Sequence, residues 1–361
     1  MYMNKETFEN IYKINTLEKN SCKPYADIQK EWNDDCKEFS DTPLPSVLPA
    51  VRRIIAIGDL HGDWKVTIES LKIAGVIDDD NNWIGNDTVV VQIGDQIDRC
   101  RGYQYKCDNK NATINDENSD IKILKFFTDL HNQAQKKGGA VYSLLGNHEL
   151  MNVMGDLRYV SYKGLSEFDE ENNNMIKGKK NRKDAFKRGS ELSNFMGCTR
   201  QSAIIIGSNL FVHAGIVPKL AEKYSVKEIN NLIRKWLLNK LEDGKELKKV
   251  LKKTDYSPFW FRTLGQLAPN LEMENDGGIC DKFVPPVMDI YEINNIIIGH
   301  TPQSFITDEG INSTCSNHVW RVDVGVSDAF SVYDKEKTAK NPNRNVQVLE
   351  ILNDKEFNIL K

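Results

Sequence analysis

The chain has 361 residues, of which 40% are hydrophobic and 28% charged, and its formal net charge at neutral pH is −4. This composition is that of an ordinary globular protein and excludes collagen-like and coiled-coil chains, and no apolar run approaches the roughly 18 residues of a membrane-spanning helix. Because the net charge is slightly negative, a general attraction to nucleic acid or to an anionic membrane is not expected.

The first six residues lack the apolar core of a secretory signal. The chain also has seven cysteines, an odd number without regular spacing, which predicts reduced thiols rather than a disulfide framework. We therefore expect an intracellular, cytoplasmic protein.

The N-terminal half predicts an alternation of strands and helices. Residues 1–50 are polar, mixed in charge and end in three prolines, which predicts a helical or irregular N-terminal extension before a single domain at 51–361. Apolar runs predict strands at 52–57, 88–93 and 140–145, and helical spacing predicts helices at 64–77 and 120–137. Two polar segments without period predict surface insertions, near 101–119 and 169–184.

The C-terminal half is richer in strands. Residues 204–212 predict two antiparallel strands joined by a turn at 207–210. Ser225 and Glu228 form a capping-box pattern, and the apolar spacing that follows predicts an amphipathic helix to Leu241. Further strands are predicted at 294–298, 319–324 and 346–352.

Five short segments combine glycine with residues that bind metal ions, and they contain four of the six histidines. They are Gly58-Asp59-Leu60-His61-Gly62, Gly94-Asp95-Gln96-Ile97-Asp98-Arg99, Gly146-Asn147-His148-Glu149, His213-Ala214-Gly215 and Gly299-His300-Thr301. Each follows an apolar run that reads as a buried strand, so the ligands are expected on tight turns at strand ends, where they can converge on one cleft.

The residue types in these segments predict a two-metal phosphate hydrolase. Carboxylate, imidazole and amide-oxygen ligands suit Mn, Fe or Zn, and the absence of cysteine from all five segments disfavours a thiolate-bound structural zinc. The predicted ligands are Asp59 and His61 for one ion, Asp95 as a bridge, and Asn147, His213 and His300 for the other. Two such cations share a hydroxide that can attack phosphorus directly. No Cys-x5-Arg loop offers a thiolate for a covalent route.

The remaining polar residues of the segments predict catalytic roles. His148 can protonate the leaving group, and Asp98 can orient it. Arg99 and Arg262 are candidate clamps for phosphate oxygens, because a guanidinium presents a planar fork of donors. Each segment taken singly could be ordinary turn chemistry, but all five in this order favour catalysis.

Three polar residues outside these roles are interpreted more plainly. His131 lies on a predicted helix and His318 opens a predicted strand, so we interpret both as structural. Asp323 is either a carboxylate that supports the metal ligands or a turn residue.

The motifs resemble those of the phosphoprotein phosphatase family of metallophosphoesterases, also called calcineurin-like. The run from Gly146 to Tyr159 is most similar to the Shewanella-like, bacterial-type branch. The resemblance implies an α+β fold, a central β-sandwich of two mixed sheets flanked by α-helices in four αββα layers, with a dinuclear centre at one edge. It also implies phosphate contacts from Arg99, Asn147, His148 and Arg262. Members of this branch dephosphorylate serine/threonine or tyrosine, and several favour phosphotyrosine, so a phosphorylated protein or peptide is the expected substrate.

Cys100 departs from the family pattern, which has glycine after the motif arginine. A free thiol near the metals is therefore expected, and oxidative inhibition through Cys100 is a hypothesis.

Other functions stay open. The nearest alternative is hydrolysis of dinucleoside polyphosphates or small phosphate esters, and a further one is a phosphate-binding module without catalysis. A nuclease is disfavoured because no second histidine lies two residues beyond His300. The sequence carries no sign of the oligomeric state.

Overall fold

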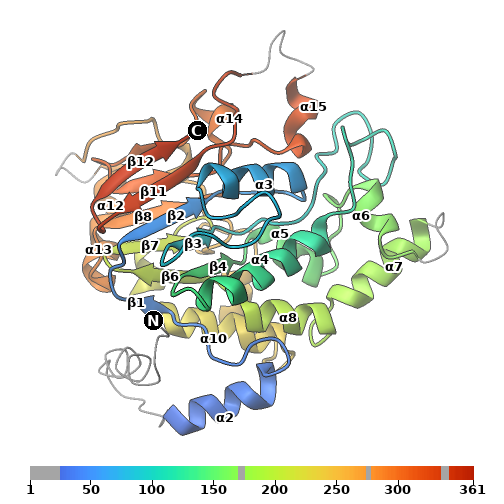
Figure 1. Ribbon diagram of the computed structural model, residues 1–361, viewed down its shortest axis with the longest axis horizontal. Coiled ribbons are helices and arrows are strands. Elements are labelled where there is room, and N and C mark those ends of the chain that lie inside the picture. The colour runs from blue at the N-terminus through green and yellow to red at the C-terminus, as the bar shows by residue number, and fades with distance from the viewer. Residues whose placement is uncertain (1–24, 170–174, 274–277, 335–340) are drawn as a thin grey trace.

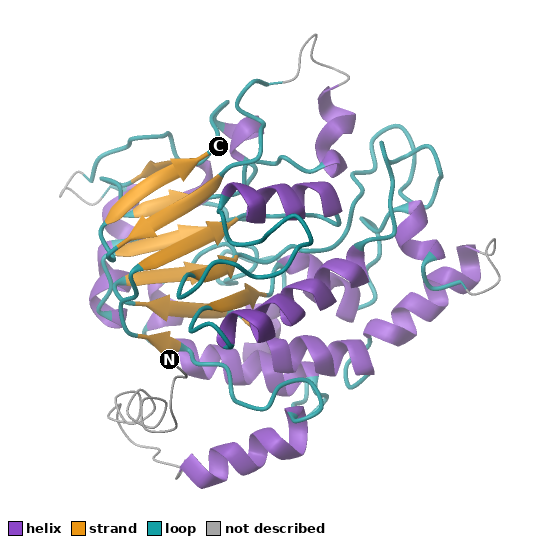
Figure 2. Ribbon diagram, viewed as in Figure 1, coloured by secondary structure: helices purple, strands orange, loops and turns teal. Residues whose placement is uncertain are grey.

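The fold is a sandwich of two mixed six-stranded sheets whose outer faces are covered by helices (Figures 1 and 2). The computed structural model describes residues 25–169, 175–273, 278–334 and 341–361. The predicted α+β architecture with four αββα layers is confirmed.

The first sheet has the strand order β12-β11-β2-β3-β4-β5. Its members are β2 (Arg53–Ile57), β3 (Val89–Gln92), β4 (Ala140–Leu144), β5 (Arg200–Gln201), β11 (Val348–Leu352) and β12 (Glu356–Leu360). Strands β2, β3, β4 and β5 run parallel, and β11 and β12 are antiparallel additions at one edge.

The second sheet has the strand order β1-β6-β7-β8-β10-β9. Its members are β1 (Val47–Leu48), β6 (Ala203–Ile206), β7 (Asn209–Val212), β8 (Asn295–Ile298), β9 (Asn312–Thr314) and β10 (Val319–Arg321). Strands β7, β8 and β10 are parallel neighbours. The predicted hairpin at 204–212 is confirmed as the antiparallel pair β6 and β7.

Helices occupy most of the connections between the strands. The N-terminal half contains α2 (Tyr25–Cys36), α3 (Trp64–Ile73), α4 (Asp120–Gln135), α5 (Asn147–Val153), α6 (Tyr162–Ser166), α7 (Met175–Phe186) and α8 (Glu191–Thr199). The C-terminal half contains α9 (Pro218–Ala221), α10 (Val226–Leu237), α11 (Lys245–Leu251), α12 (Ile279–Phe283), α13 (Pro285–Tyr291), α14 (Gln303–Ile306) and α15 (Ser331–Asp334), with 3-10 turns η1 (Leu264–Gln266) and η2 (Asp328–Phe330). The Ser225–Glu228 capping box at the start of α10 is confirmed.

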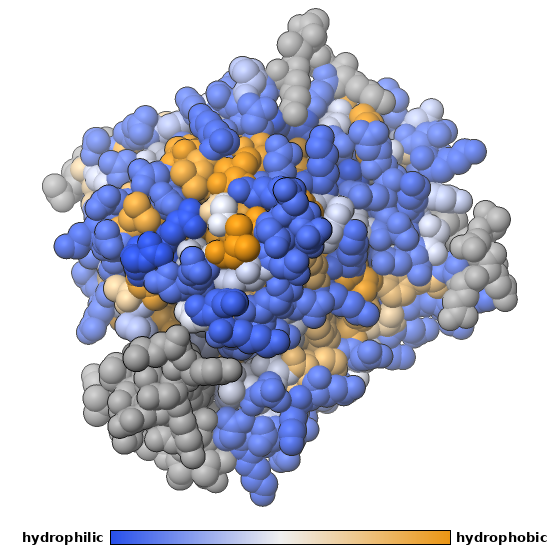
Figure 3. Space-filling model, in the orientation of Figure 1, coloured by the Kyte–Doolittle hydropathy of each residue, from blue (hydrophilic) through white to orange (hydrophobic). Residues whose placement is uncertain are grey.

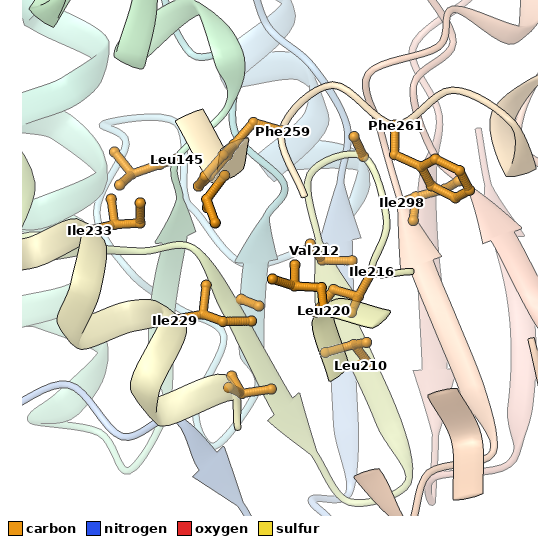
Figure 4. Packing of buried hydrophobic residues seen from close by; sticks show 14 of the residues in the cluster. Leu145, Leu210, Val212, Ile216, Leu220, Ile229, Ile233, Phe259, Phe261 and Ile298 are labelled. Carbon is orange, nitrogen blue, oxygen red and sulfur yellow. The ribbon is translucent and has the colours of Figure 1, made fainter. Parts of the chain in front are cut away.

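Alternation of side chains along the strands builds the layers. Ile54 points into the cluster between the sheets, whereas its neighbour Ile55 packs under α3 and α4. On the other sheet, Phe211 faces the sandwich interior and Val212 packs toward α10. Figure 4 shows Ile229 and other apolar side chains filling the space between α10 and this sheet. Both faces of each central strand are therefore buried, which fits their continuous apolar runs.

Two predicted segments have structural roles that their polarity did not indicate. Within the extension predicted at 1–50, strand β1 pairs in parallel with β6 and so belongs to the sandwich. Helix α7 begins inside the segment predicted as a surface insertion near 169–184, and its Arg182 side chain is fully buried. Residues 1–24 and 170–174 of these segments lie outside the described residues.

None of the helices in the described ranges is long and apolar enough to cross a membrane. Figure 3 shows that the face seen in Figure 1 is covered mostly by hydrophilic residues, with hydrophobic ones in small groups.

The cysteines form disulfides, which contradicts the prediction of reduced thiols. The pairs are Cys36–Cys198, Cys100–Cys107 and Cys280–Cys315, and the seventh cysteine, Cys22, lies outside the described residues. The prediction of reduced thiols was wrong because it relied on spacing along the sequence. The fold brings the cysteine partners together, so their spacing shows no pattern. Disulfides are typical of proteins in oxidising compartments, so these three disulfides do not favour a cytoplasmic location. The cytoplasmic location stays a prediction.

The longest of these crosslinks should contribute the most stability. Cys36–Cys198 joins α2 to α8 across 162 residues, whereas Cys100–Cys107 spans 7. In the chain-entropy model, restricting the unfolded chain raises the unfolding free energy by about 5 kcal/mol for the first disulfide and by about 2 kcal/mol for the second. Urea denaturation of the two double serine variants should show the larger loss of unfolding free energy for Cys36→Ser/Cys198→Ser. Equal losses would contradict this ranking.

His131 should make the fold sensitive to mild acid. Burial lowers the pKa of His131 from 6.5 to about 4, and its Nδ1 lies 2.9 Å from the Val141 carbonyl oxygen. The unfolded chain therefore binds the proton first as pH falls from 6.5 to 4, so stability is lost in that window, by about 2 kcal/mol at pH 5. The unfolding free energy of the wild type should be lower at pH 5 than at pH 7. In His131→Gln we expect the contribution of His131 to this difference to be absent. An unchanged difference would contradict the assignment.

Candidate metal centre

The turns that follow five strands meet at one edge of the sandwich. The parallel strands β2, β3 and β4 end side by side and lead into the first three motifs, and β7 and β8 of the other sheet lead into His213 and His300. Because the carboxyl ends of parallel strands lie at the same edge of a sheet, ligands far apart in the sequence converge there. The amides of Leu60 and His61 donate to the Asp95 carbonyl oxygen and join the first two turns.

Six predicted ligands come together in two overlapping groups that share Asp95. In the first, Asp95 Oδ2 lies 3.9 Å from His61 Nε2 and 3.8 Å from His148 Nε2, and Asp59 Oδ2 lies 3.8 Å from His61 Nε2. All four side chains are buried.

The second group shares Asp95 with the first. His213 Nε2 lies 3.4 Å from Asp95 Oδ2, 3.0 Å from Asn147 Oδ1 and 3.2 Å from His300 Nδ1. The Nδ1 of His213 is 2.8 Å from the Ile93 carbonyl oxygen. A carbonyl oxygen only accepts, so Nδ1 donates to it and the opposite nitrogen, Nε2, faces the group.

The donor sets fit bound cations. Ligand bonds of roughly 2.0–2.2 Å to one ion place neighbouring donor atoms about 3–4 Å apart, as the separations in both groups are. Burial, together with the nearby charges of Asp323 and Asp95, raises the pKa of Asp59. Burial by itself would raise the pKa of Asp95, but the nearby rings of His213, His148 and His61 outweigh burial and lower it. Buried carboxylates this close to one another, such as Asp59 and Asp95, are stabilised when positive charge lies between them.

Glycines permit these close approaches. A Cβ atom at Gly146 would lie 2.1 Å from Asp95 Oδ1, and one at Gly299 would lie 2.3 Å from Asp59 Oδ1. The ligands themselves accept unusual backbone angles: φ is +45° at His61, +51° at Asp95 and +65° at His300. Left-handed conformations of non-glycine residues are uncommon and occur preferentially at functional sites.

Glu149 is a supporting residue to which the sequence analysis assigned no role. Its carboxylate accepts the backbone N–H groups of Asp95, Gln96 and Gly146, at 3.0, 2.8 and 2.7 Å. Burial, with the charge of Asp95 added, raises its pKa to about 7. One side chain therefore fixes the turns after β3 and β4 relative to each other. The Gly146 contact is a local capping interaction at the start of α5, whereas only the fold brings the amides of Asp95 and Gln96 to Glu149.

Asp98 and His148 form a dyad beside the first group. His148 Nδ1 lies 2.7 Å from Asp98 Oδ2, so the opposite ring nitrogen faces Asp95. The other Asp98 oxygen accepts from Asn152 Nδ2 at 2.9 Å. Arg182 of α7 donates to Asn152 Oδ1 at 2.8 Å and to Asp120 at 2.7 Å. Neither Asn152 of α5 nor Arg182 of α7 was predicted as a support, because α7 lies in a polar segment without helical period and meets α5 only in the folded structure.

The three arginines at the site differ in their contacts. Arg99 donates to the Gly62 carbonyl and forms ion pairs with Asp63 at 2.8 Å and Glu117 at 3.0 Å. Its guanidinium is thus occupied by partners outside the two ligand groups. Arg262 donates to the His300 carbonyl oxygen at 2.8 Å and so borders the second group.

Arg101, which the sequence analysis did not single out, borders the first group. One of its guanidinium nitrogens lies 2.8 Å from His61 Nε2, and the guanidinium carbon lies 4.4 Å from the Phe330 ring centre and 5.2 Å from that of Tyr159. The two rings and a hydrogen bond to the Cys100 carbonyl fix its plane. The only sequence signal was its place two residues after the motif arginine.

Cys100 has no free thiol in this structure, because it is bonded to Cys107. The expected free thiol is therefore wrong, and the hypothesis of oxidative inhibition loses the thiol on which it depended.

The chain belongs to the calcineurin-like phosphoesterase family, which it matches over residues 52–304. It is a hydrolase of phosphate esters of the metallophosphoesterase type, and the predicted resemblance to the Shewanella-like branch is confirmed.

Relatives and solved structures agree with this membership. An uncharacterized protein of Acanthamoeba polyphaga mimivirus is 41% identical over 254 residues, covering 65% of this chain and 97% of that protein. Shewanella-like protein phosphatase 2 of Arabidopsis thaliana is 29% identical, covering 76% of this chain and 71% of its own. The cold-active protein-tyrosine phosphatase of a psychrophilic Shewanella species has the same fold, with a TM-score of 0.62, 21% identity, and coverage of 89% of this chain and 83% of that one.

Proposed function

We propose that this chain is a metal-dependent phosphoprotein phosphatase that hydrolyses phosphomonoesters of serine, threonine or tyrosine in proteins or peptides. One observation carries the proposal: two groups of buried ligands share Asp95, and the Asp98–His148 dyad lies directly beside them. The similarity to a plant protein called a Shewanella-like protein phosphatase supports the choice of substrate class.

The residues present would hold two ions, with Mn, Fe or Zn as the candidates. Asp59, His61 and Asp95 would hold one, and the second would have the ligands Asp95, Asn147, His213 and His300. When bound, such a pair supplies a nucleophile at neutral pH and neutralises charge on the phosphoryl oxygens.

The chain itself supplies the proton and the substrate contacts. As the bond from phosphorus to the seryl, threonyl or tyrosyl oxygen breaks, His148 would give the proton on Nε2 to that oxygen. Asp98 keeps Nδ1 protonated and stabilises the charged ring. The Asn147 amide is adjacent and would add a contact to the phosphate.

Two guanidinium groups border the ligand groups, Arg101 at His61 and Arg262 at His300. We therefore assign the binding of phosphate oxygens to Arg101 and Arg262. Arg99 stays a predicted phosphate contact, although its donors already have protein partners.

Separate alanine variants of Arg101 and Arg99 should divide their roles. Arg101→Ala should lower kcat/KM for p-nitrophenyl phosphate by about 10²-fold and weaken inhibition by inorganic phosphate, because it removes charge-assisted hydrogen bonds to the anion. Arg99→Ala should mainly lower the melting temperature, since it leaves Asp63 buried without its partner. The reverse pattern would restore Arg99 as the phosphate contact.

The proposed function is tested by removing metal with a chelator, restoring Mn, Fe or Zn, and assaying a panel of phosphopeptides. Phosphopeptide turnover that returns with metal is expected, and the panel reports the preference among phosphotyrosine, phosphoserine and phosphothreonine. Diadenosine tetraphosphate is assayed beside them. Turnover of that compound without turnover of any phosphopeptide would reject the proposal.

A further inference from the structure

A wide groove lies next to the metal centre, with a volume of about 1060 Å³. One wall is the loop after Arg101, from Gly102 to Asp108, and the opposite wall is formed by α7. Figure 1 shows this loop, in teal, rising beside α6 and α7. The walls are joined by an ion pair between Lys179 and Asp108. The two facing walls thus come from the segments whose polar sequences predicted surface insertions, and residues 155–159 with Leu165 complete the lining.

The groove carries an excess of positive charge. Five cations line it, namely Lys106, Arg158, Lys179, Lys180 and Lys183, against three carboxylates, Asp108, Asp156 and Asp184. Lys179 pairs with Asp108, Arg158 with Asp156, and Asp184 with a lysine outside the groove. The other three lysines are exposed and form no ion pair within the described part of the chain.

The lysines of α7 face the groove while the same helix is anchored to the dyad. Lys180 and Lys183 are three residues apart and therefore lie on one side of α7. Between them in sequence, Arg182 points inward to Asn152, which in turn donates to Asp98. Charges on the outer side of α7 thus have a fixed position relative to the catalytic dyad.

Tyr159 connects the groove to the reacting groups. It lines the groove, and its ring centre lies 5.0 Å from that of His148 and 5.2 Å from the guanidinium carbon of Arg101. A chain whose phosphorylated side chain reaches these two groups would therefore continue past Tyr159 into the groove.

We propose that this groove binds acidic residues that flank the phosphorylated residue, so that the enzyme selects phosphopeptides rich in aspartate and glutamate near the phosphate. The inference rests on the proposed function and deepens it. Three exposed ion pairs with Lys106, Lys180 and Lys183 would favour an acidic peptide over a neutral one by about 10-fold at low ionic strength, and less as salt screens them.

The test compares two phosphopeptides of equal length with the same phosphorylated residue, flanked either by aspartate and glutamate or by asparagine and glutamine. We expect wild-type kcat/KM to be about 10-fold higher for the acidic peptide, mainly through KM. Lys180→Glu/Lys183→Glu should abolish or invert this preference. Turnover of p-nitrophenyl phosphate, which is too small to reach the groove, should stay unchanged.

A matched control is Lys245→Glu/Lys248→Glu, which changes two exposed lysines at the same spacing on α11, outside the groove. This variant should keep the wild-type preference for the acidic peptide. Equal turnover of both peptides by the wild type, or a preference that survives in Lys180→Glu/Lys183→Glu, would overturn the groove inference and leave the proposed function standing. Hydrolysis of p-nitrophenyl phosphate without hydrolysis of either peptide would overturn both.

Discussion

Replacing His148 by asparagine should lower kcat by about 10²–10⁴-fold for a phosphoserine peptide, the usual range for loss of a general acid. The seryl oxygen is a poor leaving group that needs a proton as the bond to phosphorus breaks. p-Nitrophenolate leaves readily without one, so p-nitrophenyl phosphate should lose much less activity. The ratio of the two losses, measured as kcat at saturating substrate, reports proton donation itself.

Asp98→Asn should reproduce this pattern in weaker form, because an amide in place of the Asp98 carboxylate no longer stabilises the charged His148 ring. His131→Gln serves as the control, since His131 is a buried histidine on α4 away from the metal centre. Undiminished phosphoserine turnover in His148→Asn would remove His148 from the role of acid. Equal losses on both substrates would instead give His148 a role in binding.

Asp95→Asn should almost abolish both metal content and turnover. Among the described residues, Asp95 Oδ2 is the only carboxylate oxygen that lies within 4 Å of a ring nitrogen of all three histidines, His61, His148 and His213. Asparagine keeps the shape but removes the charge that both ligand groups share. We expect bound metal, measured by elemental analysis, to fall from about two ions per chain, and kcat/KM to fall by about 10³-fold or more.

Asp129→Asn is the matched control, because Asp129 is an exposed carboxylate on α4. It should keep both ions and full activity. If Asp95→Asn retains two ions and wild-type turnover, the shared-carboxylate assignment fails. If it loses metal and activity but melts at the wild-type temperature, the loss is assigned to the centre and not to unfolding.

Much of the fold was predictable because local patterns and the global structure agree. The runs at Arg53–Ile57 and Val89–Gln92 are buried on both faces, so their apolar character is continuous and their ends are clear. The capping box at Ser225 likewise needs only neighbouring residues. In contrast, β1 has two residues, and its pairing with β6 leaves no local pattern.

The site divides in the same way. The convergence of Asp59, His61, Asp95, Asn147, His213 and His300 could be predicted because each lies in a short motif directly after a strand, and their role as metal ligands stays a prediction. Their supports could not be predicted. Arg182 reaches the dyad from a helix in a polar segment, and the cysteine partners are up to 162 residues apart. Such contacts depend on tertiary packing. The local spacing of residues in a single sequence does not reveal them.

The carboxylate of Glu149, which holds three amides from two turns, has a consequence for how the protein matures. Because an internal acid clamps the two turns, the chain itself holds the ligands on them in register. Binding of ions would then require no rearrangement of these two turns.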